Sequence, residues 1–246
     1  DPADGQSDVR VEREFVVKLR GIVNERTLGA DAFTIVPEPT AVYSYYNSYE
    51  GRYVISWPMQ PQTGYTVTLA GKIADIFGNT LGKDEAIGFR TGNRKPFAHL
   101  NVPNEVGTYN AYADTEIAVS YRNVSELNFE LYTVSEADAQ RLLGPQGWEV
   151  RREYKPKADA LLREWTVPVT PESNSNTLTK YQLGDATTGI PLPSGIYWLE
   201  LRAPEVKYVS GADGVPQGTQ EVPRHLLIVS PFNLIAKKAA SEILVW

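Results

Sequence analysis

Hydrophobic and polar residues alternate with a period of two along most of this chain. In the segment 14–20, for example, Phe15, Val17 and Leu19 share one face. The same spacing aligns further sets: Tyr53, Ile55 and Trp57; Tyr65, Val67 and Leu69; Ile117, Val119 and Tyr121; Leu127, Phe129 and Leu131; Tyr197, Leu199 and Leu201. This alternation is typical of antiparallel strands with one buried face. Because turns rich in Pro, Gly and Asn separate the runs, the pattern predicts an all-β protein made of antiparallel β-sandwiches.

Two short stretches interrupt the period of two. In SEADAQRLLG, Ser135 is a good N-cap with acidic residues behind it, and Gly144 suits a C-cap, so we expect a helix there. The stretch 157–165, KADALLREW, is compatible with either a helical turn or the start of a strand. We read GPQGW, residues 144–148, as a turn. The second half of the chain is therefore expected to hold one or two short helices.

The best domain boundary is FRTGNRKPF, residues 89–97, where a strand ending at Phe89 gives way to a polar hinge before Pro96. We place a first domain at residues 1–94 and a second at 95–230. The last segment, 231–246, ends in the apolar run 243–246 and reads as a strand that leads into, or is borrowed from, a following domain. An exposed apolar strand is also a pairing template, so residues 241–246 are a candidate for dimerisation.

The composition excludes several classes of function. A net charge of −6 with no basic cluster argues against nucleic-acid binding. The chain has no cysteine, which excludes disulfides, zinc–thiolate sites and a cysteine nucleophile within it. It contains no apolar run long enough to span a bilayer and no signal-peptide pattern at residues 1–10, so an exported protein would carry its signal outside this sequence.

No motif of known chemistry is present. The chain lacks both a Gly-x-Ser-x-Gly elbow and a glycine-rich phosphate loop, so we expect no enzyme activity, catalytic residue, metal or cofactor. His99 and His225 lie beside apolar residues and are expected to be structural.

The densest aromatic stretch is YSYYNSYEGRYVISW, residues 43–57. Its rings could form a contact surface for a protein or a glycan. Alternatively, half of them belong to the core and the rest cover a sheet edge. The candidate contact residues are Tyr43, Tyr45, Tyr46, Tyr49, Tyr53 and Trp57.

Oxygen-bearing side chains gather in DIFGNTLGKDE, residues 75–85. Asp75, Asn79, Asp84 and Glu85 are of the type that calcium takes, but the spacing is not that of an EF-hand loop. The alternative is that Asp75 caps a turn and that Gly78 and Asn79 adopt left-handed backbone conformations.

The first domain resembles the bacterial Ig-like domain of cell-surface proteins. The matching segments are PADGQSDV at 2–9, LGADAFTIVP at 28–37, QPQTGYTVTLAGKIADIFGNTLG at 60–82 and GFRTG at 88–92. The Asp-x-x-Gly-Asn turn and the closing Phe-x-Thr-Gly are the specific part of this match.

The second domain resembles a macroglobulin-type β-sandwich from bacterial alpha-2-macroglobulin-like proteins. The matching segments are 120–135, 163–169, 192–204 and above all HLLIVSPFNLIAKKAASEILVW at 225–246. The family's pattern at the end of this domain falls on Ser230, Asn233, Leu234, Ile235, Lys237, Leu244, Val245 and Trp246.

The resemblance implies a function. Members of that family are large extracytoplasmic proteins (secreted, periplasmic or anchored at the cell surface) that trap proteases, many through a thioester in a Cys-Gly-Glu-Gln motif. This chain has no cysteine, so it would be a non-catalytic structural fragment whose partners are neighbouring domains and, through the parent protein, proteases. The alternative is a cell-surface adhesion or carbohydrate-binding module that uses the tyrosine-rich hairpin.

Overall fold

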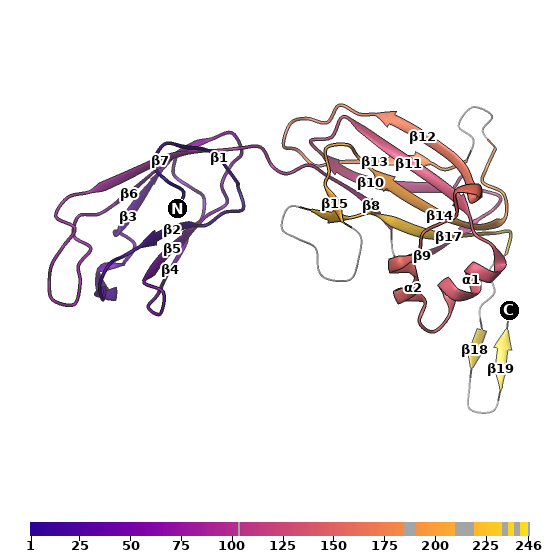
Figure 1. Cartoon of the computed structure of the whole chain (residues 1–246), viewed down its shortest axis with the longest axis horizontal. Helices are drawn as coiled ribbons and strands as arrows, with labels where there is room; N and C mark the ends of the chain where they lie inside the picture. The colour runs from indigo at the N-terminus through magenta and orange to yellow at the C-terminus, as the bar shows by residue number, and fades with distance from the viewer. Residues whose placement is uncertain (103, 185–189, 210–218, 233–235, 239–241, 246) are drawn as a thin grey trace. The chain divides into compact units, whose positions relative to one another are not determined.

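The computed structural model describes residues 1–246 except 103, 185–189, 210–218, 233–235, 239–241 and 246. It divides into two units, Asp1–Arg94 (unit 1) and Lys95–Trp246 (unit 2). Both units are built mainly of β-strands packed as sheets, and both helices of the described chain lie in unit 2 (Figure 1). The prediction of an all-β sandwich fold with one or two short helices is confirmed.

Unit 1 consists of two sheets. Their strand orders are β1-β7-β6-β3 and β2-β5-β4, and all strand pairs are antiparallel except β1 with β7. A short 3₁₀ turn at Glu25–Thr27 precedes β3. The strands are β1 (Gln6–Val9), β2 (Phe15–Lys18), β3 (Phe33–Val36), β4 (Tyr43–Asn47), β5 (Arg52–Ser56), β6 (Gly64–Leu69) and β7 (Glu85–Thr91).

Aromatic rings fill the space between the two sheets of unit 1. Phe15 stacks on Phe89 with ring centroids 6.0 Å apart, and Trp57 meets Tyr65 edge-on at 5.5 Å. All four rings are 5% exposed or less. Large buried rings supply much of the apolar area that stabilises a domain of this size. The alternation of apolar residues in β2, β5 and β6 therefore marks the face that enters this core.

A buried threonine joins β7 to the loop before β6. Thr91 is 1% exposed; its hydroxyl donates to the carbonyl of Gln60 at 2.6 Å and accepts from the amide of Thr63 at 2.9 Å. This threonine belongs to the closing Phe-x-Thr-Gly segment. Its hydroxyl thus satisfies two backbone groups in a partly buried position.

Replacing Thr91 with valine, which has nearly the same shape, should lower the free energy of unfolding of unit 1 by about 1–3 kcal/mol. The loss arises because Gln60 and Thr63 each keep a backbone group without its partner. Urea unfolding measures the effect. The matched control is Thr66→Val on the exposed face of β6, which should change stability little; equal effects of the two variants would contradict this role for Thr91.

Unit 2 has a five-stranded sheet, β12-β11-β14-β17-β9, facing a three-stranded sheet, β13-β10-β8. A further two-stranded parallel ladder joins β15 to β16. The strands are β8 (Phe97–Asn101), β9 (Val106–Asn110), β10 (Glu116–Arg122), β11 (Glu126–Thr133), β12 (Leu161–Pro168), β13 (Thr177–Gln182), β14 (Gly195–Arg202), β15 (Tyr208–Val209), β16 (Gln220–Glu221) and β17 (Arg224–Ser230).

The core of unit 2 lies between these sheets. Phe129 on β11 stacks on Trp165 of β12 at 4.9 Å and contacts Tyr181 of β13 at 5.4 Å, which ties the two sheets together. Leu131 and Leu199 are cross-strand partners and are both fully buried. These residues belong to the sets that the sequence aligned on one face of each strand.

Helices cover the other face of the five-stranded sheet. The helices are α1 (Glu136–Leu143) and α2 (Gly147–Glu153). A second apolar cluster forms between them and the sheet, around the buried residues Leu142, Trp198 and Leu226. The five-stranded sheet is therefore buried on both faces along β14 and β17.

Helix α1 begins as predicted. The hydroxyl of Ser135 accepts a hydrogen bond from the amide of Asp138 at 3.2 Å, the contact expected of an N-cap. Gly144 occupies the C-cap position, although its backbone is extended (φ −68°, ψ 178°) rather than left-handed.

The predicted turn at residues 144–148 is present only at 144–146, where the amide of Gly147 donates to the carbonyl of Gly144 at 2.8 Å. The prediction is wrong for 147–148, because α2 begins at Gly147. A side chain at this glycine would come within 2.2 Å of the carbonyl oxygen of Leu142, so glycine permits the close approach of the two helices. The stretch 157–165 resolves as a 3₁₀ turn, Ala158–Ala160, followed by β12.

After Ser230 the described chain contains two short strands, β18 (Ala236–Lys238) and β19 (Ile243–Val245), which pair with each other in an antiparallel hairpin. Ser241 and Trp246, the ends of the segment for which we predicted dimerisation, lie outside the described residues. So do Asn233, Leu234 and Ile235 of the macroglobulin-type pattern.

Candidate contact surface and buried ion network

The tyrosine-rich stretch folds as a hairpin of β4 and β5, with β4 at the edge of its sheet (Figure 1). Tyr43 and Tyr45 are two residues apart, so they share a face. They are 67% and 41% exposed, with ring centroids 5.9 Å apart. Tyr49, in the connecting turn, is fully exposed, and the side chain of Asn47 accepts from its amide at 3.1 Å. The hairpin thus presents three tyrosine rings to solvent.

Two of the predicted contact residues are not on this surface. Tyr53 and Trp57 are 1% and 5% exposed and belong to the core of unit 1, so the prediction that they contact a partner is wrong. Tyr46 is cross-strand partner to Tyr53 and packs partly against the same core. The register of β4 on β5 decides these positions: residues opposite the buried side of β5 turn inward.

A cavity of about 450 Å³ adjoins the start of β4. Its lining includes Tyr43 and Trp57, whose indole nitrogen has no hydrogen-bond partner in the described structure. The remaining walls are Val11, Glu12, Arg13, Ala41, Val42, Ser56 and Pro58. The cavity beside the exposed tyrosines is therefore lined by both apolar and polar side chains.

Of the candidate calcium ligands, Asp75 and Asn79 bond to each other within a turn. One carboxylate oxygen of Asp75 accepts from the amides of Phe77 and Asn79 at 2.8 and 2.9 Å, and the other accepts from the side-chain amide of Asn79 at 2.8 Å. The bond from the Asn79 side chain is the main reason why the pKa of Asp75 is lowered. The predicted turn cap is confirmed, as is the left-handed backbone at Gly78 (φ 89°).

Asn79 itself does not have a positive φ, so that part of the turn prediction is wrong. Asp84 accepts from the amide of Gly71 at 2.7 Å, and Glu85 lies 3.2 Å from Lys83. Within the described ranges, no three or more His, Cys, Asp or Glu residues are grouped so that they could hold a metal ion.

Replacing Asp75 with alanine should speed hydrogen exchange at the amides of Phe77 and Asn79, because both lose their acceptor. Nuclear magnetic resonance reads each amide directly. Asp84→Ala serves as the control: it should expose the amide of Gly71 and leave those two unchanged. Unchanged exchange at Phe77 in the Asp75 variant would contradict the turn geometry.

The two histidines differ. His99 on β8 is exposed, so the expectation that both are structural is wrong for this one. His225 is fully buried, and its Nε2 lies 2.8 Å from the hydroxyl of Tyr109. Its Nδ1 has no hydrogen-bond partner in the described part of the chain. Burial lowers the pKa of His225 to about 4, while backbone groups of Glu105 and Asn104 oppose the shift.

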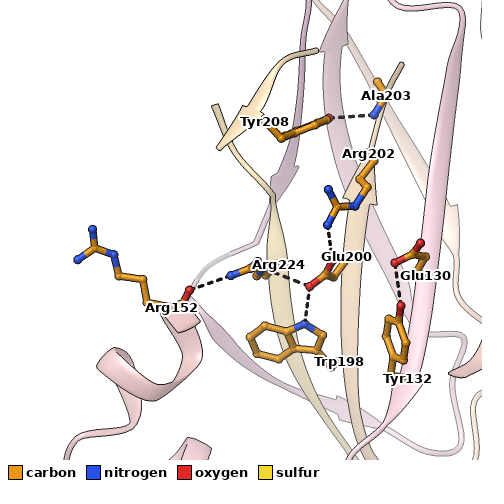
Figure 2. A network of polar contacts seen from close by, with 9 residues as sticks. All are labelled: Glu130, Tyr132, Arg152, Trp198, Glu200, Arg202, Ala203, Tyr208 and Arg224. Carbon is orange, nitrogen blue, oxygen red and sulfur yellow. Dashed lines mark hydrogen bonds and ion pairs between the residues drawn. The ribbon is translucent and has the colours of Figure 1, made fainter. Parts of the chain in front are cut away.

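A buried carboxylate on β14 organises the face beneath the helices (Figure 2). Glu200 is 5% exposed; it accepts from the indole nitrogen of Trp198 at 3.2 Å and from Arg202 at 3.0 Å. Nε of Arg224 lies 3.2 Å from the same carboxylate but is not directed as a hydrogen bond, so this contact is electrostatic. Opposite Glu200 across the strands, Glu130 accepts from Tyr132 at 2.8 Å.

Arginines attach the helices to the sheet. Arg224 donates to the carbonyl of Arg152, in the last turn of α2, at 2.9 Å (Figure 2). From the helix side, Arg151 donates to the carboxylate of Glu105 at 2.7 and 3.0 Å and to the carbonyl of Leu142 at 2.5 Å. The last bond satisfies a carbonyl group at the end of α1. The two helices are thus held to the sheet by charged as well as apolar contacts.

Sequence reasoning missed this ion network. Trp198, Glu200 and Arg202 alternate with the aligned set of Tyr197, Leu199 and Leu201, and such residues are expected to face solvent. The available signal was the tryptophan on the supposedly exposed side of β14. A large ring there indicates that something covers that side.

Comparisons with known proteins bear on the fold. No family model matches this chain, and no curated protein matches it. Salmonella alpha-2-macroglobulin reacted with methylamine is similar in structure: the TM-score is 0.65 at 10% identity, over 91% of this chain and 13% of that one. A point mutant of the Salmonella protein has a TM-score of 0.58 at 12% identity, and the match covers 84% of this chain and 12% of that one. An Escherichia coli alpha-2-macroglobulin segment spanning domains MG0-NIE-MG1 has a TM-score of 0.46 at 12% identity. The match covers 97% of this chain and 73% of that one.

The chain therefore has a macroglobulin-like all-β fold. This fold assignment rests on the two structures of Salmonella alpha-2-macroglobulin described above, whose TM-scores exceed 0.5. The chain spans 13% and 12% of the length of those proteins. In the part of the chain that the structure describes, neither helix has the length and apolar character required to cross a bilayer.

Proposed function

We propose that this chain is a non-catalytic structural segment of a large bacterial alpha-2-macroglobulin-like protein, a broad-range inhibitor that traps proteases. The observation that carries the proposal is the structural similarity to Salmonella alpha-2-macroglobulin over 91% of the chain. In this proposal unit 1 is a bacterial Ig-like domain, unit 2 is a macroglobulin-type domain, and the segment from residue 231 leads into the next domain. The protein would act outside the cytoplasm.

In this proposal the segment acts as a scaffold. Each unit has its own buried core, and in unit 2 the helices add a second apolar cluster, so the segment would hold neighbouring domains of the parent chain in place. Proteases would be partners of the parent rather than of this chain. With no cysteine, the segment takes no part in covalent capture.

The coding sequence beyond Trp246 tests this proposal. Continuation into further β-domains with a Cys-Gly-Glu-Gln motif would support a covalent trap, with this segment as its scaffold. Further β-domains without the motif would support a trap that encloses proteases without a covalent bond. A stop codon directly after Trp246 would contradict the proposal.

The exposed rings of the β4–β5 hairpin favour a second candidate function, a contact surface for a glycan or a protein in a cell-surface adhesion module. Tyr43, Tyr45 and Tyr49 are its exposed members, and Tyr46 lies at its border. Tyrosine suits such a surface because its ring stacks while its hydroxyl forms hydrogen bonds.

A glycan array probed with the labelled full chain tests the glycan form of this function. Binding that is lost in the Tyr43→Ala/Tyr45→Ala double variant would support it. Tyr112→Ala is the matched control, because Tyr112 is 80% exposed but belongs to unit 2. Silence of the array, or equal loss in both variants, would remove the glycan form.

A further inference from the structure

Strand β4 is an edge strand without the features that usually block strand pairing. It hydrogen-bonds to β5 on one side only, so every second residue directs its backbone N–H and C=O groups away from the sheet. From Thr40 to Tyr49 the sequence contains no charged residue and no proline. Natural edge strands are commonly protected by lysine, proline or inward-pointing charges.

Another edge of the described chain shows the contrast. Strand β12, at the border of the five-stranded sheet of unit 2, carries Arg163 and Glu164 and ends at Pro168. A second strand approaching β12 would meet charges and a residue that cannot donate a hydrogen bond. No such obstacle exists along β4.

The sequence of β4 is also complementary to itself. Tyr43, Ser44 and Tyr45 form a palindrome centred on the serine. If two copies pair antiparallel about a two-fold axis at Ser44, each Tyr43 lies opposite Tyr45 of the other copy. The flanking pairs would be Val42 with Tyr46 and Ala41 with Asn47.

In this register, exposed tyrosines of one copy lie beside exposed tyrosines of the other. Tyr43 and Tyr45 are on the exposed face, so pairing would form two neighbouring Tyr43–Tyr45 pairs across the joint, a cluster of four rings. Aromatic cross-strand pairs are favourable. Ser44 turns toward its own core, where its hydroxyl lies 3.4 Å from that of Tyr53. In a two-fold interface each residue meets the same surface of the other copy. Because residues 40–49 carry no charge, the paired strands bring no like charges together.

We infer that β4 is the interface for a second copy of this chain, joined antiparallel through Ser44 into one continuous six-stranded sheet. The inference deepens the contact-surface function proposed above and does not depend on the protease-trap proposal. It names the partner as another copy rather than a glycan. Because the strand is short, the association should be weak and dependent on concentration.

Cysteine crosslinking of the full chain tests the register, since the natural sequence contains no cysteine. Under mild oxidation, Ser44→Cys should form a disulfide-linked dimer several-fold faster than the control Ser48→Cys. Position 48 is an exposed serine on the same hairpin, but the register places it far from its own counterpart. Equal rates for the two variants would overturn the inference.

A second test places a charge on β4 and does not depend on how well the cysteine variant folds. Tyr45→Lys places lysines beside the joint and should abolish self-association in sedimentation equilibrium at high protein concentration. Tyr49→Lys makes the same change in charge in the turn beyond the strand and should leave self-association intact. If the unaltered chain stays monomeric at every concentration while the hairpin binds a glycan, the self-pairing inference fails and the contact-surface function stands.

Discussion

Replacing Glu200 with alanine is expected to lower the free energy of unfolding of unit 2 by about 3–5 kcal/mol, the largest effect of any single substitution considered for this chain. The glutamate side chain is only 7% exposed, and that of its partner Arg224 is 19% exposed. Without the carboxylate, Arg224 keeps its charge in a partly buried position and the indole of Trp198 loses its acceptor. Urea unfolding with hydrogen-exchange mass spectrometry reports the two units separately.

Two controls separate the causes. Glu200→Gln preserves shape and one acceptor, so it should cost less than the alanine variant. Glu116→Ala removes one partner of an exposed pair, Glu116 and Lys180, whose side chains are 43% and 72% exposed. Exposed pairs contribute about 0–1 kcal/mol. A cost for Glu200→Ala no larger than that of Glu116→Ala would contradict the assignment of Glu200 as the centre of the network.

Unit 2 is expected to lose about 2–3 kcal/mol of stability between pH 7 and pH 4.5 through His225 alone. Its pKa is about 4 in the folded chain, below the ordinary value of 6.5, because burial disfavours the charged ring. The unfolded chain therefore takes up a proton first as the pH falls. The stabilisation is complete above pH 6.5 and is lost progressively down to about pH 4. Unfolding in urea at a series of pH values measures this loss.

The other histidine provides the control for this pH dependence. His225→Gln removes the titrating ring and should abolish this part of the pH dependence, while its amide can still bond to Tyr109. His99→Gln is the matched control, because it makes the same substitution on the exposed face of β8 and leaves His225 and Tyr109 in place. If the two variants behave alike, His225 is not the group responsible.

The fold class could be predicted because the two sheets of each unit bury one face of most strands. That condition produces the period of two seen in Phe15, Val17 and Leu19 or in Leu127, Phe129 and Leu131. The condition fails at β14, where residues 197–201 are all buried because the helices cover the second face. Glu200 therefore looked like an ordinary exposed carboxylate in the sequence.

The tyrosine-rich hairpin shows a different limit. Its strands were predictable, but a tyrosine is equally at home in a core or on a surface. The cross-strand register decided the outcome, placing Tyr46 opposite Tyr53 on the inner side and leaving Tyr43 and Tyr45 outside. Nothing local in the sequence distinguishes Tyr45 from Tyr46.

The helix contacts lay beyond local reasoning as well. The N-cap at Ser135 was readable because capping depends on neighbouring residues only. The start of α2 at Gly147 depends on its approach to Leu142, and the contact of Arg224 with α2 joins residues far apart in the chain. Such contacts require the folded structure.

A protease assay on the proposed parent polypeptide tests whether this chain belongs to a protease trap. The parent is mixed with an active protease, and cleavage of a large protein substrate is compared with cleavage of a short peptide. A protease trap should suppress cleavage of the large substrate and spare that of the peptide, and the 246-residue chain alone should change neither. Equal suppression of both substrates by the parent, or suppression by the isolated chain, would contradict this proposal.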